Sequence, residues 1–253
     1  RTDSMVVSPI ESSRAAEAVA IDCGLAGTVM RFVPPLAGLH AGSVEFDGDE
    51  AAKRRPMATT IDSLRALGVS VEQPATSAGR LPFTVTSSGS IRGGELEIDA
   101  SDSSQFVSGL LLAAARFEDG LTLTHRGEHL PSMPHIEMTL DCLQKRGVDA
   151  RQTGDATWRV EPGAIAGGRV VIEPDLSNAG PFLAAAMVAG GSVTIAHWPT
   201  KTTQVGDHFE SILTQMGANV VRDERGLTLS ADGRIRGIDI DLSIGGELAP
   251  VVA

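Results

Sequence analysis

The chain has 253 residues, of which 42% are hydrophobic and 21% charged, a composition that excludes both a disordered chain and a long coiled coil. Its net charge of −11 argues against a protein that binds nucleic acid or a membrane surface, because such proteins need an extended basic face. The longest apolar runs, residues 109–115 and 181–189, are too short to span a bilayer.

Three units of similar sequence follow one another along the chain, and each alternates helices with strands. Each unit opens on a segment rich in Ala, Leu and Val, which predicts a helix that is apolar on all sides and therefore buried. A short strand and a second helix follow, and further strands complete the unit. The opening segments begin at Ala26, Ser103 and Ser177.

Glycine and proline mark the limits of the predicted helices. Gly68, Gly147 and Gly217 each follow a second helix, at the position where the backbone turns left-handed. Pro34 and Pro35 are expected to break or kink the first apolar helix. Strands are predicted at 43–46, 81–85, 95–98, 121–124 and 192–195, and the second helices end within 64–69, 143–148 and 213–218. Because strands and helices alternate throughout, the predicted class is α/β, with sheets around an inner layer of helices.

Small and hydroxyl-bearing residues stand where the three apolar helices begin. The sequences are Ala26-Gly27-Thr28, Ser103-Ser104-Gln105 and Ser177-Asn178-Ala179. Free backbone N–H groups at the positive end of a helix dipole can bind phosphate or carboxylate. The same residue types are ordinary N-caps, and for any one helix taken alone capping is the simpler interpretation. An anion site is favoured because the pattern recurs three times with basic residues nearby.

The basic residues are Arg31 and the cluster Lys53-Arg54-Arg55. Arg55 precedes Pro56, so its backbone is expected to be extended just before a helix. An arginine held at such a junction can clamp a carboxylate or phosphate with two parallel hydrogen bonds. Lys53 and Arg54 are interpreted as a solvated basic turn.

The remaining reactive residue types give no sign of a metal or nucleophile site. Cys23 and Cys142 match no metal-binding spacing and are predicted to be reduced, buried thiols of a cytoplasmic protein. His125 and His129 lie four residues apart, but the segment around them contains Gly and Pro and is a poor helix. No secretion signal, Walker loop, dinucleotide fingerprint or nucleophile elbow is present in the sequence.

Five ordered segments resemble motifs of the 5-enolpyruvylshikimate-3-phosphate synthase (3-phosphoshikimate 1-carboxyvinyltransferase) family. They resemble the family's Asn-Ala-Gly-Thr-x-x-Arg segment, its Arg-Pro-Met/Ile helix start, its Ser-Ser-Gln-Phe motif, its Ser-x-Pro-Tyr/His stretch and its crossover between domains. In this chain they are residues 25–32, 54–57, 103–114, 132–135 and 173–179. The Ser-Ser-Gln-Phe motif is the most specific of the five.

The resemblance implies a two-domain fold of repeated βαβαββ units with helices inside the sheets, an inside-out α/β barrel. Residues 1–172 would form most of one domain and residues 173–253 part of the other. The implied reaction transfers the enolpyruvyl group of phosphoenolpyruvate to the 5-hydroxyl of shikimate-3-phosphate and releases phosphate, on the way to chorismate and the aromatic amino acids. The family precedent implies a monomer that uses no metal or organic cofactor.

Four residues are assigned to phosphoenolpyruvate by the resemblance. Gly27 would lie against this substrate through its backbone, with Thr28 beside it. Arg55 would clamp the substrate, and Arg31 would support the same anionic end. A side chain at Gly27 would intrude on that space, which the family's inhibitor glyphosate also occupies.

Five further residues are assigned to shikimate-3-phosphate and to proton transfer. Ser103, Ser104 and Ser132 would bind shikimate-3-phosphate, largely through its phosphate. Gln105 would touch both substrates. Glu247 would act as the general base on the attacking hydroxyl, because a hydroxyl is a poor nucleophile without a carboxylate in hydrogen-bond reach. By its position alone Glu247 is a helix-start acid that the dipole stabilises.

The chain also departs from the family pattern. Leu25 replaces a common Asn, and His135 stands where Tyr is frequent. The family's N-terminal Pro-Gly-Ser-Lys-Ser segment and its C-terminal Lys- and Arg-bearing segment have no counterpart in these 253 residues. We therefore expect the chain alone to turn over little or no substrate.

Two alternatives remain beside the transferase hypothesis. The chain could be a non-catalytic fragment that holds shikimate-3-phosphate at Ser103, Ser104 and Ser132. It could also belong to the UDP-N-acetylglucosamine enolpyruvyl transferases, which share the fold. That family places a reactive Cys in a mobile loop, and neither Cys23 nor Cys142 fits this position.

Overall fold

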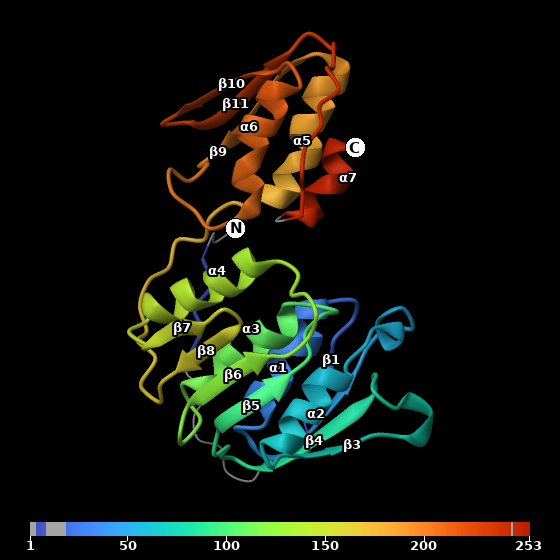
Figure 1. Ribbon diagram of the computed structural model, residues 1–253, viewed down its shortest axis with the longest axis vertical. Helices are drawn as coiled ribbons and strands as arrows, with labels where there is room; N and C mark the ends of the chain where they lie inside the picture. Colours follow the sequence, from blue (N-terminus) through green and yellow to red (C-terminus); the bar gives the residue numbers. More distant parts are fainter. Residues whose placement is uncertain (1–3, 9–18, 244) are drawn as a thin grey trace. The chain divides into compact units, whose positions relative to one another are not determined.

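The computed structural model divides into two compact units, each with its own buried core (Figure 1). It describes residues 4–8, 19–243 and 245–253. The first unit comprises residues 1–130 and 142–166, and the second comprises residues 131–141 and 167–253. The predicted domain boundary between residues 172 and 173 stays a prediction.

The first half of unit 1 is one βαβαββ repeat. Its elements are β1 (Val19–Asp22), α1 (Gly27–Ala37), β2 (Ala41–Asp47), the short 3-10 turn η1 (Ala52–Arg54), α2 (Ala58–Ala66), β3 (Ser70–Glu72), the turn η2 (Ala75–Ser77) and β4 (Phe83–Ser88). β1 pairs parallel to β2, and the other pairs are antiparallel, which gives the order β1-β2-β4-β3 across the sheet.

The next segment of the chain, residues 94–160, repeats this arrangement; it belongs to unit 1 except for residues 131–141, which include the larger part of α4 and are grouped with unit 2. Its elements are β5 (Gly94–Ile98), α3 (Gln105–Ala114), β6 (Leu121–His125), α4 (Met133–Gln144), β7 (Ala150–Gly154) and β8 (Thr157–Val160). The order across the sheet is β5-β6-β8-β7, again with one parallel pair at the first strand. Equal order and equal pairing confirm the internal repeat that the sequence predicts.

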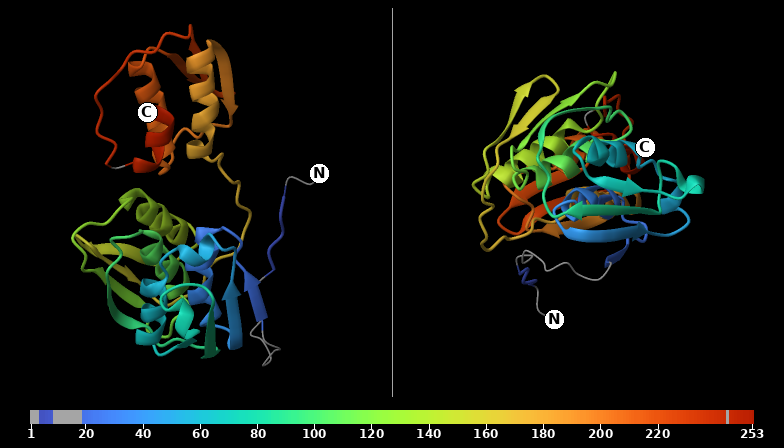
Figure 2. Two further views of the ribbon diagram at one scale, coloured as in Figure 1. Left: turned by 90° about the vertical axis from the view of Figure 1, so that its right-hand side faces the viewer. Right: turned by 90° about the horizontal axis from the view of Figure 1, so that it is seen from below.

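Unit 2 contains a third, shorter version of the repeat. Its elements are α5 (Leu176–Ala189), β9 (Gly191–Ala196), the turn η3 (Val205–His208), α6 (Phe209–Gln215), β10 (Asn219–Asp223), β11 (Gly226–Ala231), the turn η4 (Gly246–Leu248) and α7 (Ala249–Val252). The antiparallel sheet has the order β10-β11-β9. α5 and α6 cover one face of this sheet, as Figure 1, the left view of Figure 2 and the contacts of α5 with β9 and β11 and of α6 with β10 agree.

The sheet of unit 2 has an open edge at β9. In unit 1 the strands β1 and β5 pair parallel to β2 and β6, the counterparts of β9. Val170, Val171 and Ile172 precede α5 at the corresponding place in the sequence, but the structure leaves them outside the sheet and 57%, 83% and 81% exposed. Within the described residues β9 therefore pairs on one side only.

Local sequence signals for strands and helix ends are confirmed. All five predicted strands coincide with observed ones, namely β2, β4, β5, β6 and β9. Gly68, Gly147 and Gly217 have φ angles of 85°, 78° and 110°, in the left-handed region that a glycine after a helix adopts most easily.

Of the predicted break or kink at Pro34 and Pro35, the break is wrong, because α1 continues from Gly27 to Ala37, and the kink stays a prediction. Pro35 has no N–H, so it offers the Arg31 carbonyl no helical hydrogen bond. That carbonyl instead faces Gly109 of α3, where an added Cβ would lie only 2.3 Å from the oxygen. The absence of a side chain at Gly109 lets the backbones of α1 and α3 approach closely at this carbonyl. The carbonyl that lacks a helical donor is thus covered by a neighbouring helix, a contact that local sequence alone does not reveal.

α1 and α3 form the centre of unit 1. The two helices contact each other closely, while α1 also contacts β4 and α3 contacts β6. The helix pair therefore lies between the two sheets (Figure 1), as predicted for helices that are apolar on all sides. The few aromatic side chains are concentrated in this core; Phe46, Phe83, Phe106, Phe117 and Trp158 are among the largest fully buried residues.

α5 differs from the prediction of a helix buried on all sides. Leu183 and Met187 lie in the core of unit 2, but Phe182 and Val188 are 64% and 68% exposed. The reason is that the described part of unit 2 supplies one sheet to cover the helix, whereas α1 and α3 cover each other between two sheets. In the described part of the chain, no helix combines the length and the apolar composition needed to cross a bilayer.

The two cysteines have different environments. Cys23 is 3% exposed, and burial, aided by two neighbouring aspartates, raises the pKa of its thiol to about 11. A thiol held protonated in this way is a poor nucleophile. Cys142 is free and exposed, so the prediction of a buried thiol is wrong there. Its neighbours Leu140 and Leu143 occupy the buried face of α4, and the helical period turns Cys142 away from it.

Candidate active site

Seven of the nine predicted site residues lie in unit 1, around the starts of two helices. Gly27 and Thr28 open α1, and Arg31 follows one turn later. Ser103 and Ser104 immediately precede α3, and Gln105 is its first residue. Arg55 lies between η1 and α2. Ser132 and Glu247 lie in unit 2.

Arg31 joins the two helices at the site. Its Nη1 donates a hydrogen bond of 2.7 Å to Oε1 of Gln105, and its guanidinium carbon lies 4.8 Å from the centre of the Phe106 ring. The residue is only 6% exposed, and its Nε has no hydrogen-bond partner among the described residues. Burial, followed by the charge of Arg55, lowers the pKa of Arg31. A buried cation bound to a neutral amide, with a second cation nearby, favours an anionic ligand.

Arg55 supplies the second cation. Its backbone is extended, with φ −80° and ψ 141°, as expected for a residue before proline. Its Nη1 lies 3.4 Å from the carbonyl oxygen of Leu25, just before α1. The guanidinium covers Gly27 so closely that a Cβ added there would be 2.6 Å from Nη1. A glycine at this position lets the cation reach the start of α1.

The three apolar helices differ in whether a side chain caps the free N–H groups at their start. Neither Ala26 before α1 nor Ser104 before α3 makes a side-chain capping bond, although Ser104 is 3% exposed. The hydroxyl of Ser103 accepts a long bond of 3.3 Å from the Gln105 N–H. For α5 the cap is Asp175, which accepts from the Asn178 N–H at 2.9 Å. α5 is thus capped, but by Asp175 and not by Ser177 or Asn178, which lie inside the helix, so the capping interpretation of these two residues is wrong. The starts of α1 and α3 keep backbone donors for a ligand.

In unit 2 Glu247 is held by two partners. Its Oε1 accepts a hydrogen bond of 2.7 Å from the Ser177 hydroxyl, and its Oε2 lies 3.0 Å from Nε2 of His135. The Glu247 side chain is 32% exposed, so solvent or a ligand can reach it. Ser132, three residues before His135, has a φ of 55°, a strained conformation for a non-glycine residue that is frequent at functional sites.

Sequence reasoning missed the partners that hold these groups. His135 was noted only as a departure from Tyr, and Ser177 only as a helix start, yet both bind Glu247. Phe106 under Arg31 and Gly109 beside its carbonyl lie within the segment 103–114, but no role is assigned to either of them from the sequence. Each contact joins residues far apart in the sequence, so no local pattern signals it.

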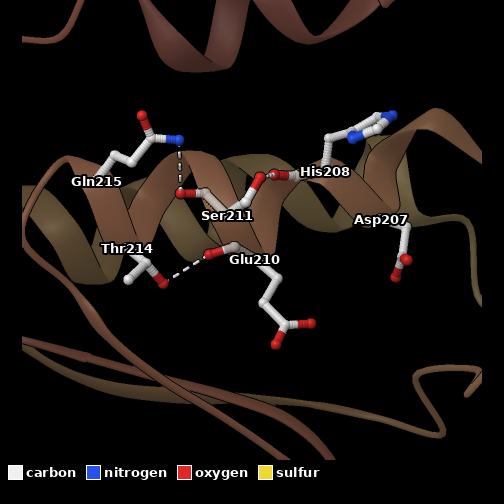
Figure 3. A pocket seen from close by; sticks show the side chains of 6 residues that line it. All are labelled: Asp207, His208, Glu210, Ser211, Thr214 and Gln215. Atoms are coloured by element: carbon white, nitrogen blue, oxygen red, sulfur yellow. Dashed lines mark hydrogen bonds between the residues drawn. The ribbon is translucent and has the colours of Figure 1, made fainter.

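A shallow depression of about 530 Å³ lies elsewhere, along α6 in unit 2 (Figure 3). Its lining contains Asp207, His208, Glu210, Ser211, Thr214 and Gln215, none of which is a predicted site residue. Arg222 pairs with both acidic side chains of this lining. The hydroxyl and amide groups bind backbone carbonyls of the same segment, as the dashed lines show. These groups are thus already partnered, and the depression offers little to a substrate.

The described residues include no cluster of three or more His, Cys, Asp or Glu side chains arranged to hold a metal ion. The polar groups that the structure holds in place at the predicted site are the two arginines, Gln105 and Glu247 with its partners.

Comparisons with known proteins agree with one another. A family model described as EPSP synthase (3-phosphoshikimate 1-carboxyvinyltransferase) matches residues 1–253. The 3-phosphoshikimate 1-carboxyvinyltransferase of Kocuria rhizophila is 57% identical over 243 residues, which cover 96% of this chain and 54% of the relative. The protein of the same name from Tropheryma whipplei is 52% identical over 230 residues, 91% of this chain and 51% of that protein. The chain thus spans about half the length of the curated relatives it matches.

The fold is also found among solved structures. EPSP synthase from Acinetobacter baumannii superimposes with a TM-score of 0.70 and 24% sequence identity, over 93% of this chain and 54% of that one. This likeness confirms the predicted α/β fold.

Proposed function

The chain belongs to the EPSP synthase family, and from this premise we propose that its protein is a 3-phosphoshikimate 1-carboxyvinyltransferase. The enzyme would transfer the enolpyruvyl group of phosphoenolpyruvate to the 5-hydroxyl of shikimate-3-phosphate and release phosphate. The observation that carries the proposal is the buried Arg31, bound to Gln105 across two helix starts and close to Arg55. We further propose a monomeric, cytoplasmic enzyme that needs no cofactor.

Such an enzyme must first offset the electrostatic repulsion between its two substrates, because both are anions. Two unit charges 4 Å apart interact by about 4 kcal/mol at the effective dielectric of a protein surface. A helix N-terminus contributes only about 0.3–1 kcal/mol toward a bound anion. Arg31 and Arg55 would therefore supply most of the attraction in unit 1, and the backbone donors at Gly27 and Thr28 would orient phosphoenolpyruvate.

Recognition of the second substrate would rest on the start of α3 and on Ser132. Ser103, Ser104 and Ser132 carry hydroxyls suited to the phosphate of shikimate-3-phosphate. Gln105 would contact both substrates, since its amide oxygen already accepts from Arg31 and its N–H₂ group remains a donor.

Glu247 would act as the general base. In the proposed reaction the 5-hydroxyl oxygen bonds to C2 of phosphoenolpyruvate, C3 gains a proton, and Glu247 takes the hydroxyl proton. Loss of a proton from C3 and departure of phosphate from C2 then restore the enolpyruvyl double bond. His135 and Ser177 hold the carboxylate from both oxygens, which would keep it oriented toward the hydroxyl.

Glu247→Gln is expected to lower kcat about 10²–10⁴-fold, the range for a lost general base, with little change in KM for either substrate. The measurement is phosphate release by the enzyme extended to the length of its curated relatives. Ser177→Ala is the matched control, since it removes one partner of Glu247 and keeps the carboxylate, and its loss should be much smaller. Wild-type kcat in Glu247→Gln would contradict the role given to Glu247.

The proposed reaction itself is tested by phosphate release from phosphoenolpyruvate in the presence of shikimate-3-phosphate. We expect turnover by the extended enzyme and little or none by a polypeptide of these 253 residues, which would still bind shikimate-3-phosphate in a calorimeter. If the extended enzyme uses UDP-N-acetylglucosamine as acceptor instead, the substrate assignment is wrong. If it binds shikimate-3-phosphate without turnover, the non-catalytic alternative holds.

A further inference from the structure

We propose that His125 is a positioning residue that fixes the turn leading into α3, through a hydrogen bond from the Ala100 N–H to its Nδ1. This turn, residues 99–104, carries Ser103 and Ser104. The inference rests on the proposed function for its effect on substrate binding, while the hydrogen bond itself can be tested without any substrate.

The topology places His125 beside this turn. His125 is the last residue of β6 and pairs with Ile98, the last residue of β5. Beyond Ile98 the chain leaves the sheet and runs directly into α3. The His125 imidazole therefore lies at the point where the chain leaves β5 on its way to α3 and the backbone pairing with β6 ends.

Ala100 transmits the position of the imidazole to Ser103. The Ala100 N–H donates a buried bond of 3.1 Å to Nδ1 of His125, and the Ala100 carbonyl accepts from the Ser103 N–H at 3.0 Å. Ala100 is fully buried, so water cannot replace either bond. The two peptide groups that flank the Cα of Ala100 are thus each held by one hydrogen bond, and the second of these bonds is made by the backbone of Ser103.

The protonation of His125 follows from the same bond. Nδ1 accepts, so the proton of the neutral ring lies on Nε2. Nε2 is buried and has no hydrogen-bond partner among the described residues. The backbone at Gly127 covers the ring, since a Cβ there would lie 2.5 Å from Cε1 of His125. A buried N–H group without a partner is unfavourable, and an apolar side chain at position 125 would not carry one. The favourable contribution of His125 is therefore its acceptor atom Nδ1.

A second set of bonds holds the other side of the turn. Asp99 accepts from the N–H and the hydroxyl of Ser101 at 2.9 and 2.6 Å, and its carbonyl accepts from the Thr59 hydroxyl at 3.1 Å. These bonds do not reach Ala100 or Ser103. Loss of the His125 bond would therefore free the part of the turn nearest α3 and leave the rest in place.

Three variants of the extended enzyme test the proposal. His125→Leu keeps an apolar side chain without the acceptor, and His125→Asn places Oδ1 near the position of Nδ1. His129→Asn changes an exposed histidine of the same loop and is the control. We expect His125→Leu to raise KM for shikimate-3-phosphate about tenfold with kcat within about threefold, because a displaced contact weakens binding. His125→Asn should restore most of the affinity, and His129→Asn should leave both constants unchanged.

Two further measurements do not depend on activity. Nitrogen NMR of the imidazole should show Nε2 protonated and Nδ1 unprotonated in the unmodified enzyme. The Ala100 amide should exchange with deuterium faster in His125→Leu than in His125→Asn. Equal exchange in all variants overturns the proposal, as does a His125→Asn enzyme as impaired as His125→Leu. An unmodified enzyme that binds no shikimate-3-phosphate overturns the proposed function instead, and the exchange data still decide the role of the bond.

Discussion

Gly109→Ala is expected to lower the free energy of unfolding of unit 1 by about 2–3 kcal/mol, as overpacking of a tight helix contact does. Elsewhere in a helix the same change stabilises by about 1 kcal/mol, because alanine is the better helix former. Here the added Cβ would lie 2.3 Å from the Arg31 carbonyl oxygen, a backbone atom that cannot rotate away. The two helices must separate, so the clash outweighs the propensity.

Tryptophan fluorescence allows the loss of stability in Gly109→Ala to be assigned to unit 1. It contains two tryptophans, the fully buried Trp158 in unit 1 and Trp198 in unit 2, which is 4% exposed. In a Trp198→Phe background, fluorescence during denaturation reports on unit 1 alone. A free energy within about 0.5 kcal/mol of the parent, a typical value for a neutral substitution, would show that α1 and α3 are not in backbone contact.

Gly27→Ala, unlike Gly109→Ala, is expected to leave the free energy of unfolding unchanged. It is expected to lower the affinity for substrate. The added Cβ would lie 2.6 Å from Nη1 of Arg55, the far end of a flexible side chain that can move without disturbing the fold. That movement displaces the cation proposed to clamp phosphoenolpyruvate. A shift of about 1 Å can cost about 10²-fold in catalysis, so we expect KM for phosphoenolpyruvate to rise about 10–100-fold.

The measurement is steady-state kinetics of the extended enzyme with phosphoenolpyruvate and with glyphosate as inhibitor. Both constants should weaken together, because both ligands are expected against Gly27. An Arg55→Ala background provides the control: there Gly27→Ala should add little, since the displaced group is already gone. Unchanged constants for both ligands in Gly27→Ala would show that the site lies elsewhere.

Features set by neighbouring residues could be predicted from the sequence. The glycines after α2, α4 and α6 need only the end of a helix to explain them, and all three are left-handed. The extended backbone of Arg55 follows from Pro56 alone. The repeat also shows in the sequence, because each unit buries the same apolar faces and so keeps the same pattern.

Features that depend on distant contacts could not be predicted. α1 is continuous through Pro34 and Pro35, and Gly109 of another helix packs against its Arg31 carbonyl. The bond between Arg31 and Gln105 joins residues 74 positions apart, and no periodicity marks such a pair. The family motifs named both residues, but only the fold shows that they bind each other.

The edge of β9 that is unpaired among the described residues bears on how this polypeptide would behave when concentrated. A strand with unpaired backbone groups is a template for pairing with another chain, and proteins usually protect such edges with charged residues or proline. β9 has the sequence Gly-Ser-Val-Thr-Ile-Ala and offers neither, and the exposed Val171 and Ile172 add apolar surface to the same unit. Two copies can therefore join edge to edge, and the sheet would then continue from one molecule into the next. Self-association of this polypeptide would in that case grow from the sheet of unit 2 and would involve none of the arginine-site residues of unit 1.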